Sequence, residues 1–452
     1  MTDPKKAVRK NKRAKDEEKA NNELPMWRQY LHAMGPGLVT GASDDDPSGI
    51  ATYAQAGAKY GPSFLWAALL TFPLMAAVQE ICDRTALATG LGLGELATKK
   101  FQRTGRWILA VLLVVLILAN CLNIAADLVA VGSGMNLLKA GPSALWAPIA
   151  GIAITGLVFF GTFERIAAIF KLLCLSLLVY IVVAIVVTHQ WVGVLEHTIL
   201  PHLDFTRAYL ALLVAILGTT ISPYLFFWQS AHRLEEMREE PEGGDRAVPL
   251  KSKTRAKAAL KERTSRLDVF SGMAFSNIVM FAIIATTSAT LHQHHITKIK
   301  SAAQAAQALK PLVGHLASQV FALGFIGSGL LAVPVLAGSG SVGLSGLLGK
   351  EWGFSKSPRK APLFYCLVGL GTVGGTALSL LNVNPIQLLV FVAVVNGVIA
   401  APLLIIVMTL SNSRDLMGDY VNGKASNVLG WLTVALMAVA SIALVASGGV
   451  TF

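Results

Sequence analysis

The chain has 452 residues, of which 54% are hydrophobic and only 14% are charged. This balance excludes an ordinary soluble globular domain and is typical of proteins that cross a membrane many times. The net charge of +12 does not indicate nucleic-acid binding, because most of the 38 Lys and Arg fall into a few short segments on one side of the predicted topology. We expect no nucleic-acid partner and no cofactor.

Apolar windows of about 20 residues mark membrane-spanning helices. Eleven predicted spans follow a basic tail over residues 1–33. Their approximate limits are 35–58, 62–86, 106–134, 143–163, 167–188, 208–232, 267–291, 315–346, 361–381, 384–410 and 427–448. Basic residues gather in the tail and in every second connection. The positive-inside rule therefore predicts a cytoplasmic N-terminus and, with an odd number of spans, an external C-terminus. We expect the protein in the plasma membrane.

The first span is interrupted at residues 44–49, which read Asp-Asp-Asp-Pro-Ser-Gly within an otherwise apolar stretch. Carboxylates at membrane depth are expensive, at about 3 kcal/mol each on an insertion scale. Proline and glycine break the helical hydrogen-bond ladder, which a membrane tolerates only where the freed backbone lines a cavity. Acidic side chains at a broken helix predict a cation site.

The sixth span is interrupted in a similar way at residues 218–223, which read Gly-Thr-Thr-Ile-Ser-Pro. Pro47 and Pro223 are thus separated by five spans, so the two spans cross the membrane in opposite directions. Paired interruptions of this kind indicate a transporter built from inverted repeats, with its site between them. The alternative is two ordinary proline kinks. Carboxylates at one break and hydroxyls at the other favour the site.

The amino-acid sequence around the two breaks resembles that of the Nramp family of divalent-metal transporters, which have a LeuT-type fold. The matching strings lie at 35–37 (Gly-Pro-Gly), 46–47 (Asp-Pro), 50–57 (Ile-Ala-Thr-Tyr-Ala-Gln-Ala-Gly), 87–90 (Leu-Ala-Thr-Gly), 94–97 (Gly-Glu-Leu-Ala) and 126–128 (Ala-Asp-Leu). The resemblance implies an all-α transporter domain over 34–452, of which a monomer is sufficient. Its parts are two five-helix repeats at about 35–188 and 208–410, with an eleventh span at about 427–448.

Several positions depart from the family pattern. Where the family reads Asp-Pro-Gly-Asn, this chain keeps Asp46 but has Gly49 in place of the asparagine. Where the family reads Met-Pro-His, this chain has Ser222 and Tyr224 in place of the methionine and the histidine. Ala130 replaces a glutamate of the third span. This pattern is similar to the Nramp-related magnesium transporter branch.

The residue types at the breaks also favour Mg²⁺. Thioether and imidazole ligands suit softer transition metals, whereas carboxylate, carbonyl and water suit Mg²⁺, Ca²⁺ and Mn²⁺. The predicted metal-binding residues are Asp46, Gly49, Thr219 and Ser222. Since Mg²⁺ usually keeps several waters, we expect Gly49 and Ser222 to make room for a hydration shell.

Five further residues are predicted to surround the site or line its vestibule. Asp44 and Asp45 either contact the ion directly or raise the local concentration of cations. Tyr224 lies next to the second break. Asp127 resembles a family position implicated in proton movement, but the glutamate and histidine of that pattern are absent, so proton coupling is not expected. Asn396 either faces the cavity or forms an interhelical hydrogen bond.

Charged residues also cluster near the inner end of the second span. Glu80, Asp83 and Arg84, with Gln79 beside them, are predicted to form a local ion pair or an inner vestibule. The segment 233–266 mixes acidic and basic residues with proline and glycine, and we expect a mobile cytoplasmic loop there.

These observations predict uptake of Mg²⁺, and also Mn²⁺, by uncoupled alternating access in the lipid bilayer. A proton-coupled Mn²⁺/Fe²⁺ transporter is one alternative. A sodium-coupled amino-acid transporter of the same fold is another, although three aspartates would repel the substrate carboxylate. The chain contains no HExxH, GxSxG or P-loop string, so we expect no enzyme.

Overall fold

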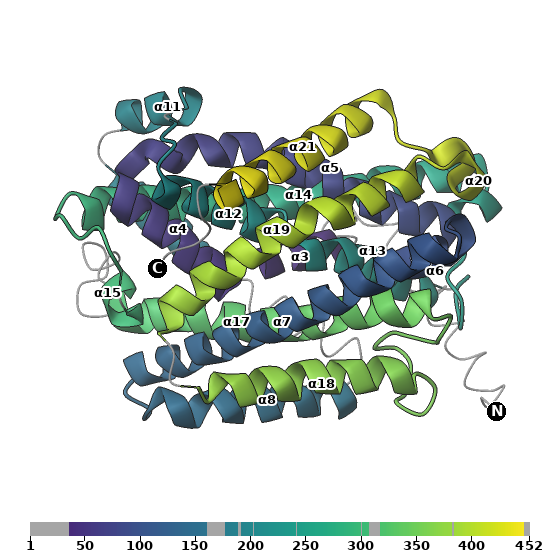
Figure 1. Cartoon of the computed structure of the whole chain (residues 1–452), viewed down its shortest axis with the longest axis horizontal. Coiled ribbons are helices and arrows are strands. Elements are labelled where there is room, and N and C mark those ends of the chain that lie inside the picture. Colours follow the sequence, from purple (N-terminus) through teal and green to yellow (C-terminus); the bar gives the residue numbers. More distant parts are fainter. Residues whose placement is uncertain are drawn as a thin grey trace, which may run out of the picture.

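The computed structural model describes residues 36–160, 177–188, 191–201, 203–240, 242–299, 301–306, 317–381 and 384–446. The predicted tail at 1–33, the first part of the predicted fifth span (167–176) and the end of the last span (447–448) lie outside these residues. Within the described residues all regular structure is helical, and the long helices run roughly along the long axis of the molecule (Figure 1).

Nine helical runs in this described part are long and apolar enough to cross a membrane, or up to ten if a bent pair counts as one span. The predicted spans correspond, in order, to α3 (Pro36–Asp44) with α4 (Pro47–Tyr60), α5 (Leu65–Thr89), α7 (Arg103–Leu137), α8 (Ser143–Phe160), α10 (Leu178–Val187), α12 (Arg207–Thr220) with α13 (Pro223–Glu239), α14 (Arg255–Thr287), α17 (Ala317–Leu347), α18 (Pro362–Ser379), α19 (Pro385–Ser411) and α21 (Lys424–Ala446). Shorter elements are η1 (Gly61–Phe64), α6 (Leu93–Lys100), α11 (Trp191–Ile199), η3 (Leu250–Ser252), η4 (Ser288–His292), α15 (Ala302–Ala306), α20 (Arg414–Met417) and η7 (Gly418–Tyr420).

Helices that are five spans apart in the chain pack against each other. Helix α5 contacts α14, α7 contacts α17 and α8 contacts α18. The two interrupted spans follow the same rule, because α3 contacts α13 and α4 contacts α12. Equivalent helices of two repeats therefore lie side by side, as expected for inverted five-helix halves that share one core.

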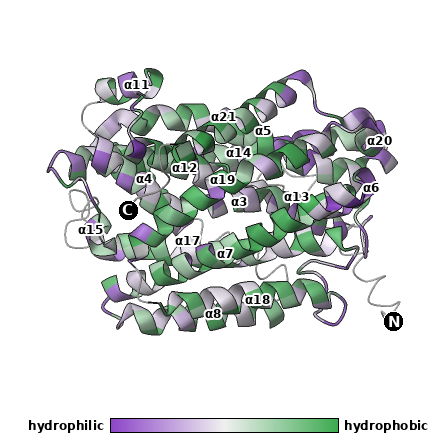
Figure 2. Cartoon of the chain, in the orientation of Figure 1, coloured by the Kyte–Doolittle hydropathy of each residue, from purple (hydrophilic) through white to green (hydrophobic). Residues whose placement is uncertain are grey.

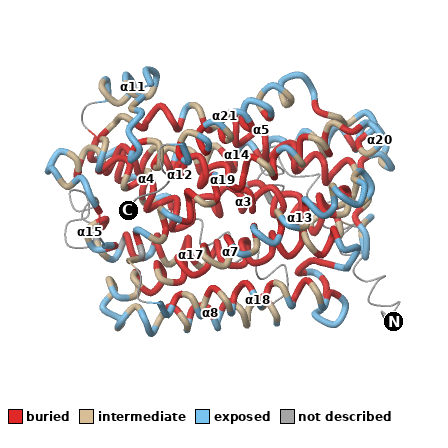
Figure 3. The backbone as a smooth tube through the Cα atoms, in the orientation of Figure 1, coloured by how far each residue is buried: buried red, intermediate tan, exposed pale blue. Residues whose placement is uncertain are grey.

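The outer helices present an apolar surface, whereas the interrupted spans lie inside. Large aliphatic side chains face outward, among them Ile152 at 70% exposure and Val439 at 65%. Figure 2 shows hydrophobic colour along α7, α8, α18 and α21, and Figure 3 shows α3 buried near the centre. An apolar exterior of this kind is suited to contact with lipid. The helix breaks expose backbone polar groups, which a membrane tolerates only where they are buried within the protein.

Helix α6 lies at one end of the molecule, here called the α6 end (Figure 1). The C-terminal end of α13 lies there too, because Trp352 adjoins both Gly92, beside α6, and Arg238 of α13. There the predicted loop at 233–266 is mostly helical, because α13 continues to Glu239 and α14 begins at Arg255. The short connection between them is held by ion pairs such as Lys253 with Glu240, at 2.7 Å. The hydropathy pattern reports the apolar part of a span and misses helical turns that extend beyond it.

The connection that follows α17 packs against the same end of α13. Trp352 lies under the guanidinium of Arg238, 4.3 Å from the ring centre. The ammonium of Lys356 donates a hydrogen bond to the carboxylate of Asp245 at 3.0 Å, and this bond holds the pKa of Asp245 below its ordinary value. Both connections at the α6 end are thus attached to the second half of the sixth span.

Candidate metal site

The first break places Asp46 at the start of α4. Asp46 has an extended backbone, and Pro47 begins the helix, since proline lacks the N–H that a helix interior needs. Oδ1 of Asp46 accepts a hydrogen bond from the Gly49 N–H at 2.8 Å and another from the Ser48 hydroxyl at 2.5 Å. This carboxylate oxygen is therefore the N-cap of α4. The second oxygen, Oδ2, points away from the cap.

The second break has the same local form. Ser222 has an extended backbone and Pro223 is the first residue of α13. The Ser222 hydroxyl donates to the carbonyls of Gly218 and Thr219, at 2.9 and 2.8 Å. It therefore satisfies the end of α12 and does not cap α13. In this state the serine hydrogen is directed at backbone oxygens.

Tyr224 joins the two breaks. Its hydroxyl lies 3.3 Å from Oδ2 of Asp46 and 3.2 Å from the carbonyl of Ser43, at the end of α3. The phenol is fully buried. The sequence placed Tyr224 in the surroundings of the site, and the structure puts it in direct contact with the carboxylate.

Gly49 and Thr219 also meet across the breaks. A Cβ at Gly49 would lie 3.1 Å from Oγ1 of Thr219 and 3.3 Å from the ring of Tyr53. The glycine thus lets α4 approach α12 closely. Its missing side chain leaves volume that Thr219 and Tyr53 occupy, whereas the sequence had suggested room for water. Thr219 Oγ1 is buried and makes no hydrogen bond of good geometry to a described residue.

The three consecutive aspartates differ in their hydrogen-bond partners. Asp44 accepts a hydrogen bond from Ser276 of α14 at 2.7 Å. Asp45 is fully buried, and its carboxylate has no hydrogen-bond partner of good geometry among the described residues. Within those residues no three His, Cys, Asp or Glu side chains converge in a metal-binding cluster. Among the three, Asp46 is the one with a described hydrogen bond to a residue of the second break, through Tyr224.

Asp127 and Asn396 lie on neighbouring helices. Asn123 of α7 donates a hydrogen bond to Oδ1 of Asn396 of α19 at 3.2 Å, so the interhelical alternative for Asn396 is the one observed. Asp127, one turn further along α7, is fully buried, and both its carboxylate oxygens lack a described partner. Its backbone carbonyl and the ring of Pro47 both lie against Gly329 of α17. Asp127 thus belongs to the wall beside the first break.

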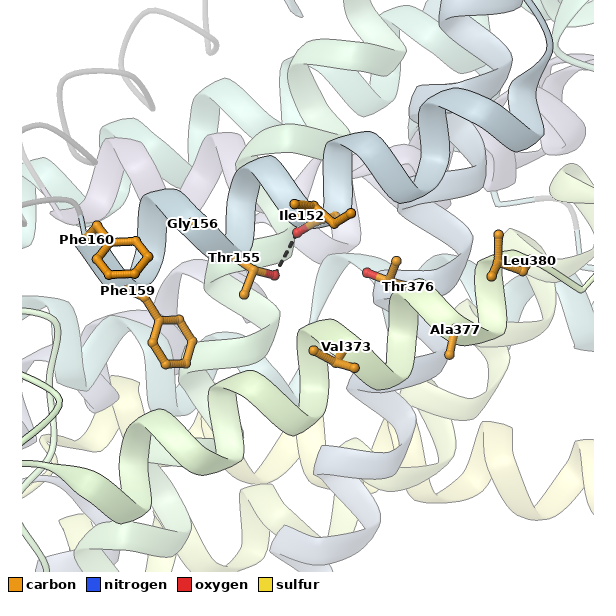
Figure 4. A pocket seen from close by; sticks show the side chains of 10 residues that line it. Ile152, Thr155, Gly156, Phe159, Phe160, Val373, Thr376, Ala377 and Leu380 are labelled. Carbon is orange, nitrogen blue, oxygen red and sulfur yellow. Dashed lines mark hydrogen bonds between the residues drawn. The ribbon is translucent and has the colours of Figure 1, made fainter.

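A separate groove of about 590 Å³ lies between α8 and α18 (Figure 4). Its walls are largely apolar, and its two threonines donate to carbonyls of their own helices: Thr155 to Gly151, and Thr376 to Thr372, both at 2.7 Å. Both threonine hydroxyls are thus engaged, and the groove lies apart from the candidate metal site at the two breaks.

Sequence reasoning did not single out Ser43 or Ser276, which contact Tyr224 and Asp44 from other helices. No local signal marks them, since serines occur throughout the spans. The local ion pair predicted near the inner end of the second span is present, between Glu80 and Arg84 at 2.9 Å. Asp83, however, pairs with Arg233 of α13, at 2.7 Å.

Two interrupted helices at equivalent positions, each restarting at a proline and meeting beside a buried carboxylate, define a transporter of the LeuT-type fold. Solved structures agree. A manganese transporter of Eremococcus coleocola superposes with a TM-score of 0.74 at 17% identity, covering 94% of this chain and 89% of that one. The nucleobase-cation-symport-1 family transporter Mhp1 gives 0.53 at 16% identity, covering 92% and 90%.

The sequence profile described as "Natural resistance-associated macrophage protein-like" (Nramp) matches residues 37–447. The chain therefore belongs to the Nramp family of multi-pass membrane proteins. Among curated relatives, the divalent metal cation transporter MntH of Klebsiella pneumoniae (strain 342) is 25% identical over 90% of this chain and 92% of its own length. The protein of the same name from Verminephrobacter eiseniae is 28% identical over 87% and 84%.

Proposed function

We propose that this protein transports divalent metal ions, with Mg²⁺ as the main cargo and Mn²⁺ as a second, by uncoupled alternating access. The observation that supports the proposal is that the side-chain and backbone groups offered by the two breaks are oxygen atoms, which we propose as the ligand set. It comprises Oδ2 of Asp46, the hydroxyls of Thr219 and Ser222, and the carbonyls at the ends of α3 and α12. Hard cations such as Mg²⁺ prefer these ligands.

The hydrogen bonds at the breaks suggest how a hydrated ion would be accepted. In the observed state the hydroxyls of Ser222 and Tyr224 donate to carbonyls at the ends of α12 and α3. Waters bound to Mg²⁺ are also donors, and they can replace these hydroxyls as partners of the same carbonyls. Asp46 would then contribute the negative charge through Oδ2, while Oδ1 continues to cap α4.

Mn²⁺ transport coupled to protons is the second candidate. It is favoured by the similarity to divalent metal cation transporters and to a manganese transporter. Asp46 suits Mn²⁺ as well as Mg²⁺, since both accept carboxylate and water. The two candidates differ in coupling: a proton-coupled carrier acidifies the receiving compartment as metal enters, and an uncoupled carrier does not. We also propose that the protein lies in the plasma membrane. Its N-terminus would be on the cytoplasmic side, because the basic residues gather in the connections of that side.

The decisive test is uptake into proteoliposomes that contain a Mg²⁺ indicator and a pH indicator. Asp46→Asn keeps an N-cap for α4 and removes the charge, whereas Asp46→Ala removes both. We expect uptake to fall by at least about tenfold in both variants, because a single neutral amide is a weak substitute for a carboxylate ligand. The Asn variant should keep its melting temperature.

The matched control is Glu80→Gln, which neutralises another buried carboxylate at a distance from the breaks. It should transport as the wild type does. Normal uptake by Asp46→Asn would show that the site lies elsewhere. Acidification in proportion to metal entry would establish the second candidate.

A further inference from the structure

A group of buried charges lies at the α6 end, apart from the metal site. Arg233 of α13 is 1% exposed and contacts carboxylates from two other helices. It donates to Asp83 of α5 at 2.7 Å and to Asp268 of α14 at 2.9 Å, and it also pairs with Glu236 on its own helix. A guanidinium shared in this way ties three helices together.

The two carboxylates have further partners. Asp83 accepts hydrogen bonds from Gln229 of α13, at 2.7 Å, and from Ser265 of α14. Asp268 accepts a hydrogen bond from the backbone N–H of Gly37 at 2.8 Å. Gly37 is the second residue of α3, so Asp268 satisfies an N–H at the start of that half-helix from another element. The charged group therefore holds α3 and α13 at once.

Helix α3 rests on α14 through backbone contacts. A Cβ at Gly37 would lie 2.5 Å from the backbone of Asp268, and a Cβ at Gly41 would collide with the carbonyl of Gly272. Glycines spaced four residues apart give a smooth face, so these contacts interlock few side chains. The polar bond from Asp268 to Gly37 is what fixes the start of α3 on this face.

Both half-helices lead from these charges to the metal site. Helix α3 ends at Asp44, two residues before Asp46, and α13 begins at Pro223, next to Ser222. A movement of either half-helix at the α6 end therefore moves the break at its other end.

We propose that Asp83, Arg233 and Asp268, here called the clasp, form the gate that closes the metal site toward the α6 end. The clasp opens when α3 and α13 separate from α14 and α5, and it closes when Arg233 again bridges the two carboxylates. Intact buried ion pairs contribute little net stability, because hydration of the separated charges offsets their attraction. A gate of this chemistry can therefore open without a large net cost. The inference rests on the proposed transport function.

Thiol accessibility tests the clasp without requiring transport. Reporter cysteines are introduced one at a time, as Thr40→Cys on α3 and Ser230→Cys on α13, both at buried positions. The background is a chain in which the four native cysteines are alanine. In proteoliposomes, a membrane-impermeant maleimide is supplied at the α6 end, and labelling rates are compared with and without Asp268→Asn or Arg233→Gln.

We expect both clasp variants to raise the labelling rate of each reporter by about tenfold or more, because a weakened closed state increases the open population. Glu80→Gln is the matched control: Glu80 and Arg84 form a buried pair at the same end. Glu80 also pairs with Arg266 of α14 at 3.4 Å, and Arg84 bonds to Tyr420 and Asn422, but none of these bonds reaches α3 or α13. Its labelling should stay at the wild-type rate.

Unchanged labelling in Asp268→Asn and Arg233→Gln would overturn the clasp. Equal acceleration in Glu80→Gln would also overturn it, since the effect would then be general loosening. A third variant, Asp83→Asn/Arg233→Met/Asp268→Asn, removes the charges together and avoids an unpaired buried charge; it should label fast while keeping a single chromatographic peak. Calorimetry with Mg²⁺ alone tests the proposed function separately: lack of binding by the wild type would refute transport and leave the labelling result intact.

Discussion

At the scale of single residues, Asp46 has two roles that belong to different oxygens. Oδ1 accepts from Ser48 and the Gly49 N–H, and these bonds hold the start of α4. Oδ2 has a long contact, 3.3 Å, to the Tyr224 hydroxyl. A carboxylate anchored by one oxygen presents the other in a fixed direction, which reduces the ordering cost of binding an ion.

Tyr224 is expected to compete with the ion for this oxygen. Tyr224→Phe removes a donor shared by two acceptors, so the free energy of unfolding should fall by about 1 kcal/mol. Mg²⁺ affinity should rise a few-fold, because Oδ2 of Asp46 no longer has to release a hydrogen bond. Thermal unfolding in detergent and calorimetry measure the two effects.

Tyr180→Phe is the control for this change. Tyr180 is also buried, and its hydroxyl has no hydrogen-bond partner among the described residues. Its loss should leave Mg²⁺ affinity unchanged. If Tyr224→Phe instead weakens Mg²⁺ binding, the tyrosine is a ligand of the ion and not its competitor.

Asp46 and Ser222 could be predicted from the sequence because each precedes a proline inside an apolar span. The contact between Asp46 and Tyr224 could not, since 178 residues separate them. The pairing of Asp83 with Arg233 was missed for a related reason: Arg84 lies next in the chain and offers a nearer partner. Local sequence identifies chargeable groups, but only packing decides which of them meet.

At the scale of elements, the first half of the first span depends on close backbone contact. The described part of α3 (Pro36–Asp44) lies directly against α14. Glycine at positions 37 and 41 is what permits this approach. Because this contact interlocks few side chains, α3 can move away from α14 as a unit.

Gly41→Ala should therefore damage the protein far more than its size suggests. The added methyl meets the carbonyl of Gly272, and overpacking of this kind costs about 1–3 kcal/mol. We expect a lower melting temperature and slower Mg²⁺ uptake.

Gly156→Ala on α8 is the control, because a Cβ there meets nothing within 4 Å. It should be neutral or stabilising by up to about 1 kcal/mol, through helix propensity. Similar melting temperatures for the two variants would contradict this role of the close contact between α3 and α14.

The elements were predicted well where hydropathy and proline act together, as at Pro47 and Pro223. They were predicted poorly at 233–266, where charged helical turns continue past the apolar part of the span. The opposite charges there pair within the helices and connection, as Lys261 does with Glu236 at 3.0 Å. Composition alone cannot separate such turns from a loop.

At the scale of the whole molecule, the repeats bring both breaks to one place. Helices of the first repeat pack on their equivalents in the second, so two sites far apart in the chain become one. The clasp then lies at the α6 end of the same two half-helices. A single movement of α3 and α13 can both open the path and alter the ligand positions, which is the requirement of alternating access.

An uncoupled carrier of this design should follow the membrane potential alone. A divalent ion gains about 2.8 kcal/mol across 60 mV, so accumulation should approach about a hundredfold at that potential. Proteoliposomes clamped with valinomycin and potassium gradients, loaded with Mg²⁺ and pH indicators, measure this limit. The internal pH should stay constant, and the accumulation ratio should change tenfold for each 30 mV or so, the value for two charges. Carriage of one proton with each ion would move three charges, giving a tenfold change for each 20 mV or so together with internal acidification. That pair of results would contradict uncoupled transport while leaving the oxygen-lined site in place.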